Sequence, residues 1–273
     1  MRTANAIAKE MWAPSTWQQR LSLAGQFATF CRAHGKRMNE ESAVAFIAAK
    51  QVAPSTKLQY ARMLRAMMNM DRTPLDMMIM GLQKIAARSE IKQARPLSKQ
   101  EMDTIIRSRI DWKEQTVFRL AWITASRWSE IAALTKKNFQ RTDDGSVILD
   151  WAVAPKTAKM DPHRAPRFIK TQGKGAFALI QLLATLRPEE HLTRLTTADV
   201  ERILAPYGAT AHSTKRGALR HAAELVDVRG MDPHVIAQLA KHVDPFDLPQ
   251  NTARYLGHHT TLLTKVSSVV ALM

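Results

Sequence analysis

One arginine stands where the sequence is otherwise apolar. The stretch FRLAWITASRWSEIAAL places Arg127 between two apolar helical segments. A guanidinium buried at such a position is costly unless an anionic group meets it. Glu130, three residues further along, is one candidate for that group, and a ligand with negative charge is the other. The local sequence therefore predicts either an internal ion pair or an anion-binding site around Arg127.

The charge of the whole chain favours an anionic ligand. The 273 residues carry a formal net charge of +16, and the pI is near 10.3. Lys and Arg outnumber Asp and Glu by 15 to 6 in residues 1–95 and by 25 to 18 in residues 96–273. Basic charge in both parts suits a protein that wraps a nucleic acid. A soluble basic protein without such a partner, or one that meets anionic membranes, is the alternative.

Later stretches carry further cationic, histidine and tyrosine side chains. In chain order they are APKTAKM, AHSTKRGALRHAAEL, IAQLAKHVDP and NTARYLGHH. Together with TASRWSEIAAL, this order resembles the tyrosine recombinases, also called the phage-integrase family. The first arginine of that family lies in a T-G-x-R-x-x-E pattern followed by apolar residues, and Ala125 stands where the pattern has glycine. The resemblance singles out Arg127, Lys156, His212, Lys215, Arg216, His242 and Tyr255.

The resemblance implies that two cationic side chains flank the scissile phosphate of DNA. Arg127 would be the first of them. The family's H-x-x-R pattern, which starts here at His212, has Lys215 in the arginine position and Arg216 directly after it. Arg216 is the first choice for the second cation, Lys215 the second and Arg220 the third. The choice matters because arginine binds two phosphate oxygens through its planar fork, whereas lysine is a point charge.

The same resemblance implies a tyrosine nucleophile. Tyr255, in the T-x-x-Y signature, would attack the phosphorus. A phenol has a pKa of about 10 and needs a nearby base and a positive field. His212 is the candidate base. Lys156, or Lys159 as second choice, would protonate the departing 5′ oxygen, and His242 would hydrogen-bond the phosphate.

The implied activity is site-specific recombination of double-stranded DNA through a 3′-phosphotyrosyl intermediate. The resemblance implies no cofactor and no metal, and self-association to a dimer or tetramer on DNA. His258 and His259 are adjacent and could suggest a metal site, but no further Cys or His lies at ligand spacing from them. The HSTKRGA stretch and the long interval from His242 to Tyr255 resemble recombinases of eukaryotic mobile elements, such as tyrosine-recombinase retrotransposons, more than common bacterial integrases.

Two other functions remain open at this stage. A type IB topoisomerase shares the chemistry but relaxes supercoils without a paired site. A domesticated recombinase that binds DNA without cutting it is the second, and the lysine at position 215 favours it.

The elements that must position these residues are mostly helices. Apolar spacing predicts four helices before residue 95, with Ser15 and Asn39 as N-caps and Pro74 in a first turn. Their ranges are 15–35, 39–51, 54–70 and 73–90. We therefore expect residues 1–95 to form a helical DNA core-binding domain.

The rest of the chain has a mixed pattern. Pro96 ends a basic linker, and Ser98 and Glu101 form a capping-box signature. Helices are predicted at 98–109, within 112–138 and, after position 175, over most of the chain. DDGSVILDWAVA and RAPRFIK predict two strands of a hairpin with a long basic connection. Residues 96–273 are thus predicted to be a mixed α+β catalytic domain with a C-terminal helix, and the whole fold mostly α with a small β-hairpin or sheet.

Composition bounds the location of the protein. Cys31 is the sole cysteine, so an intrachain disulfide is impossible, which fits the reducing cytoplasm or nucleus. The first residues lack the apolar run of a signal peptide, and we expect no membrane span. The C-terminal LTKVSSVVALM is apolar enough to need a partner surface, either in its own chain or on a neighbouring subunit.

Overall fold

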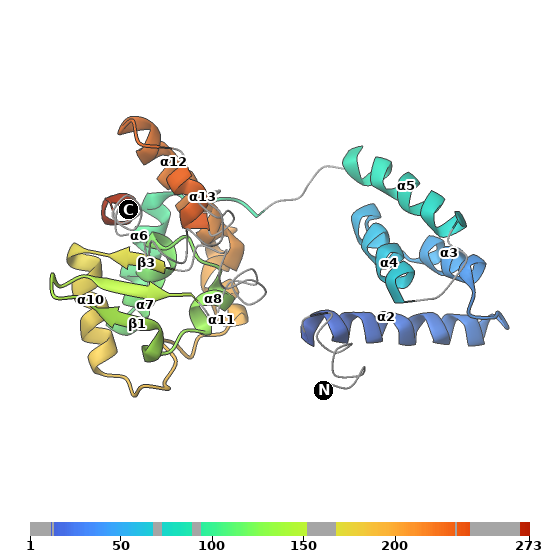
Figure 1. Cartoon of the computed structure of the whole chain (residues 1–273), viewed down its shortest axis with the longest axis horizontal. Coiled ribbons are helices and arrows are strands. Elements are labelled where there is room, and N and C mark those ends of the chain that lie inside the picture. The colour runs from blue at the N-terminus through green and yellow to red at the C-terminus, as the bar shows by residue number, and fades with distance from the viewer. Residues whose placement is uncertain are drawn as a thin grey trace, which may run out of the picture. The chain divides into compact units, whose positions relative to one another are not determined.

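The computed structural model describes residues 12, 14–67, 73–88, 94–151, 168–232, 234–240 and 268–273. The chain divides into two compact units, Met1–Lys92 and Gln93–Met273, and Figure 1 labels the elements of each. The sequence analysis placed the boundary near Arg95, three residues into the second unit.

Unit 1 is a bundle of helices. Its described helices are α2 (Pro14–Ala33), α3 (Glu40–Ala49), α4 (Pro54–Met67) and α5 (Thr73–Arg88). The Asn39 side chain accepts a hydrogen bond from the backbone N–H of Ser42, as predicted for an N-cap. The prediction for Ser15 was wrong, because α2 already begins at Pro14. Each helix turns an apolar face to a common core that includes Phe27, Phe46, Ile47, Leu64 and Leu75.

Unit 2 combines helices with one small sheet (Figure 1). Its elements are α6 (Lys99–Ser108), α7 (Trp112–Ile123), α8 (Trp128–Ala132), η1 (Lys136–Asn138), β1 (Phe139–Arg141), β2 (Val147–Asp150), β3 (Phe168–Thr171), α10 (Gly173–Ala184), α11 (Thr197–Leu204), η2 (Ala205–Tyr207), α12 (Ala211–Val228) and α13 (His234–Ala240). The predicted capping box is confirmed, because Ser98 accepts from Glu101 N–H and Glu101 accepts from Ser98 N–H. The fold is mostly α with a small sheet, as predicted.

The sheet has the order β1-β2-β3 and is antiparallel throughout. The β2–β3 hairpin is confirmed, with Leu149 opposite Ile169. Val147, Leu149, Ile169 and Thr171 are buried, whereas the residues between them are half-buried. This alternation with period two turns one face of the hairpin to the core. The strand β1 was missed by the sequence analysis.

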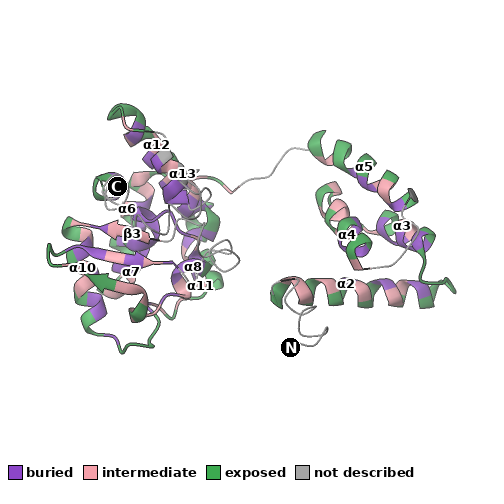
Figure 2. Ribbon diagram, viewed as in Figure 1, coloured by how far each residue is buried: buried purple, intermediate pink, exposed green. Residues whose placement is uncertain are grey.

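Helix α7 occupies the centre of unit 2. Residues Thr116 to Ile123 are buried except for one exposed position, Arg119. Helices α6, α8, α10 and α12 all pack against α7, and Figure 2 shows buried residues on the sheet and on α8 in the same unit. The chain end joins the same core, because Val269 and Val270 are 1% and 3% exposed. Of the two alternatives for the C-terminal segment, residues 268–273 therefore pack on their own chain.

Candidate active site

A sharp turn between α7 and α8 carries Arg127. The Thr124 hydroxyl donates to the carbonyl of Leu120 at 2.6 Å and lies 2.7 Å from the Ser126 hydroxyl oxygen. Ala125 has φ +45° and is fully buried. A left-handed backbone favours glycine, which is the residue that the recombinase pattern has at this position. The turn makes Arg127 the N-cap of α8, so its side chain leaves the apolar seam at the start of a helix.

Arg127 is held by Glu130. Its Nη1 donates to Glu130 Oε1 at 2.8 Å, and its backbone N–H donates to Oε2 at 2.9 Å. The side chains of Arg127 and Glu130 are 43% and 5% exposed, respectively. The idea of a buried guanidinium is thus corrected: the carboxylate is the buried member, and the arginine presents the rest of its fork outward. The internal ion pair therefore involves a cation whose side chain is still 43% exposed.

Lys215 interacts electrostatically with this ion pair. The residue is only 6% exposed. Its Nζ donates to the carbonyl of Ala240, the last residue of α13, at 3.0 Å. Burial lowers the pKa of Lys215 to about 8; Glu130 acts in the opposite direction and Arg127 in the same direction. Arg127, Glu130 and Lys215 therefore form one electrostatic cluster, which we call the cation cluster.

The other α12 candidates lie around Lys215. His212 is exposed in the first turn of the helix, and Arg216 is half-buried. Consecutive side chains on a helix point about 100° apart, so the side chain of Arg216 points in a different direction from that of Lys215. Among the described residues, Arg216 makes no ion pair or side-chain hydrogen bond. Arg220 is exposed and pairs with Glu224 at 3.4 Å, on the α12 turn that follows.

Sequence reasoning missed two features that position α12. The first is the Ala240 carbonyl that holds Lys215, since a backbone contact between helices leaves no trace in composition. The second is Gly217, where an added Cβ would lie 2.2 Å from the carbonyl oxygen of Leu97 and 2.9 Å from the Trp122 ring. A glycine inside a helix was a visible signal for close packing.

The remaining predicted site residues, Lys156, Lys159, His242 and Tyr255, lie outside the described residues. Within the described ranges, no group of three His, Cys, Asp or Glu side chains is arranged to hold a metal ion.

Sequence comparison finds no matching family model and no matching curated protein. Solved structures do match. The Tn1549 transposon integrase in complex with circular intermediate DNA superposes with a TM-score of 0.58 at 13% identity, over 94% of each chain. The chain has the fold of an integrase.

Two further integrase structures match at lower TM-scores. The integrase from mycobacterium phage Brujita gives a TM-score of 0.44 at 12% identity, over 96% of this chain and 88% of that one. The Tn1549 integrase with transposon right end DNA gives 0.41 at 12% identity, over 87% and 95%. The match with a TM-score of 0.58 concerns the fold alone. In this integrase fold, none of the described helices is long and apolar enough to cross a membrane.

Proposed function

We propose that this protein is a site-specific DNA recombinase of the tyrosine type. The observation that carries the proposal is the cation cluster on an integrase fold, in which Arg127 and Lys215 gather around the buried carboxylate of Glu130. Preorganised cations of this kind stabilise the negative charge that grows on a phosphate during phosphoryl transfer. The net charge of +16 supports a polyanionic substrate.

In each step of the proposed reaction, one P–O bond forms and one P–O bond breaks. The Tyr255 oxygen bonds to phosphorus and the P–O5′ bond breaks, which leaves a 3′-phosphotyrosyl link and a free 5′ hydroxyl. His212 accepts the phenol proton, and Lys156 or Lys159 supplies a proton to the departing 5′ oxygen. A second 5′ hydroxyl then attacks the phosphotyrosine and releases Tyr255. His242 hydrogen-bonds the phosphate throughout.

In this proposal, residues 1–95 are a DNA core-binding domain and residues 96–273 the catalytic domain. The partner is double-stranded DNA, on which the protein assembles as a dimer or tetramer. The matched Tn1549 structure contains DNA, which supports this partner for the present chain. Its affinity is expected to fall steeply with salt because phosphate contacts release counterions. The retrotransposon branch stays a prediction.

Covalent trapping tests the proposal. The probe is a library of duplexes with randomised sequence and a nick beside the cleavage position, which prevents religation and traps the intermediate. The expected result is a protein–DNA adduct that survives denaturation and disappears in Tyr255→Phe. An adduct that persists in Tyr255→Phe would place the nucleophile elsewhere.

Lys215 favours one alternative, a relic that binds DNA but does not cut. Lysine grips phosphate less specifically than arginine, and here its Nζ already has a carbonyl partner. DNA binding without any adduct in the wild type would establish this alternative. Relaxation of a supercoiled plasmid without exchange between paired sites would instead indicate a type IB topoisomerase-like enzyme.

A further inference from the structure

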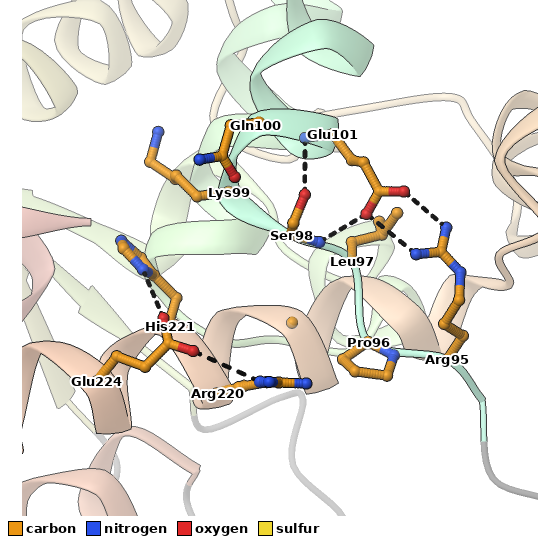
Figure 3. Close-up of a pocket in the computed structure, with 11 residues that line it drawn as sticks. Arg95, Pro96, Leu97, Ser98, Lys99, Gln100, Glu101, Arg220, His221 and Glu224 are labelled. Carbon is orange, nitrogen blue, oxygen red and sulfur yellow. Dashed lines mark hydrogen bonds and ion pairs between the residues drawn. The ribbon is translucent and has the colours of Figure 1, made fainter.

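The chain enters unit 2 through a short segment that lies against α12. We call residues 94–98 the strap; Leu97 within it is 2% exposed. In sequence, the strap follows directly on the linker that leaves unit 1. Together with the start of α6, it lines a pocket whose opposite wall is Gly217, Arg220, His221 and Glu224 of α12, as Figure 3 shows.

The strap is seated on α12 by backbone contacts. Leu97 N–H donates to the carbonyl of Ser213 at 3.3 Å, in the first turn of the helix. One turn further, Gly217 lets the Leu97 backbone approach so closely that any Cβ would collide with it. Ser213 lies between His212 and Lys215 in sequence. The strap therefore contacts the very turn that carries the candidate base and the second cation.

Arg95 fastens the strap at its other end. Its guanidinium makes two hydrogen bonds to the Glu101 carboxylate, at 2.9 and 3.1 Å, and Nη2 also donates to the carbonyl of Tyr207. Figure 3 shows the fork of Arg95 facing Glu101. Tyr207 ends the 3-10 helix η2, only three residues before the Thr210 N-cap of α12. Arg95 thus ties the strap both to α6 and to the approach to α12.

We propose that the strap is a positioning element, in which Arg95 and Gly217 fix the first turn of α12 and so place Lys215 and His212 for catalysis. The catalytic part of this inference rests on the proposed function. The structural part, that the strap orders the first turn of α12, does not.

The main test compares Arg95→Ala with Arg95→Lys and Lys99→Ala. Lys99 is a matched control, because it is a neighbouring cation paired with Asp103 on α6 alone. With the nicked duplex at saturating concentration, Arg95→Ala is expected to slow adduct formation about tenfold, which is within the range for small misplacements of catalytic groups. Arg95→Lys should restore part of the rate, and Lys99→Ala should keep it. Equal melting temperatures show that the fold is retained.

The competing role for Arg95 is a direct contact with DNA phosphate. In that case Arg95→Ala weakens DNA affinity but keeps the wild-type rate at saturation, and this outcome overturns the proposal. Gly217→Ala is a second variant, placed where α12 contacts the backbone of Leu97. It should slow the rate at least as much as Arg95→Ala, because the methyl group displaces Leu97.

Hydrogen exchange separates the two levels of the inference. Amides of residues 209–217 are expected to exchange faster in Arg95→Ala than in Lys99→Ala, whether or not the protein cuts DNA. If the wild type forms no adduct but this difference is seen, the proposed function fails and the strap stands. If exchange in 209–217 is unchanged by Arg95→Ala, the strap does not order α12 and the inference is wrong.

Discussion

The two cations of the cluster are anchored in opposite ways. Arg127 is half exposed, and its partner is a buried carboxylate on the same short helix. Lys215 is itself buried, and its Nζ donates to an uncharged carbonyl at the end of another helix. Burial also lowers the pKa of Lys215 to about 8.

The two cations therefore depend on different contacts for their positions. The ion pair of Arg127 and Glu130 forms between residues only three positions apart in the chain. The position of Lys215 depends on α12 and α13 meeting, so its contribution is lost when either helix shifts. A fixed charge and a conditional charge therefore act side by side.

The largest expected effect follows from removing the fixed charge. Arg127→Ala should lower the single-turnover rate of adduct formation by about 10²- to 10³-fold, the usual cost of one preorganised electrostatic contact. Lys215→Met should cost less, because Arg127 remains. Rates measured on the nicked duplex check the order; a greater loss in Lys215→Met would reverse the comparison.

Arg127→Ala should also lower the stability of the protein, whereas Lys215→Met should not. Arg127→Ala removes the ion-pair partner of the buried Glu130 carboxylate and leaves it with Lys215 and the backbone N–H of residue 127, which should cost about 2 kcal/mol in the free energy of unfolding. Urea denaturation measures this, and Arg127→Ala combined with Glu130→Gln should recover most of the loss. Lys215→Met removes a buried charge rather than stranding one, so it should not lower stability at pH 7. A comparable loss there would show that Lys215 is structural.

Titration of Lys215 sharpens the comparison further. Its pKa lies below the ordinary 10.5, so the unfolded chain binds more protons between about pH 8 and 10.5. Stability therefore rises through this window, and the cost of burying the charge is fully present below pH 8. The stability difference between wild type and Lys215→Met should change with pH there. The rate of adduct formation should fall above about pH 8 in the wild type and hold in Lys215→Arg.

The smallest effect concerns the turn before Arg127. Ala125→Gly removes a left-handed alanine but also a buried methyl group, so stability should stay within about 1 kcal/mol of the wild type. Ala125→Val should lower it by about 2 kcal/mol, because a branched residue tolerates this φ poorly. Equal stabilities of the two variants in urea would mean that the turn is not strained.

Local signals in the sequence predicted local structure well. Asn39, Ser98 and Glu101 form caps because the residues concerned lie within one turn of each other, and such contacts can be read from spacing alone. The hairpin β2–β3 was visible in its apolar runs. The strand β1 was missed because Phe139–Arg141 is three residues long and mostly exposed, so it has no alternation to detect.

Long-range contacts explain what the sequence did not show. Lys215 and Arg216 are both basic and adjacent, and only the packing of α12 decides which of them meets Arg127 and Glu130. The strap was predicted as a basic linker. Its contact with α12 depends on Gly217, which lies 120 positions after Leu97 in the sequence. Such pairings arise from tertiary structure and have no signature in either segment alone.

The burial of Val269 and Val270 has a practical consequence. These residues fill space in the core of unit 2, within five residues of the C-terminus. A purification tag or fluorescent fusion attached directly after residue 273 would therefore lie next to packed side chains. Removal of the last six residues would open a hole among apolar neighbours, so truncated versions should be judged by solubility before any assay is interpreted.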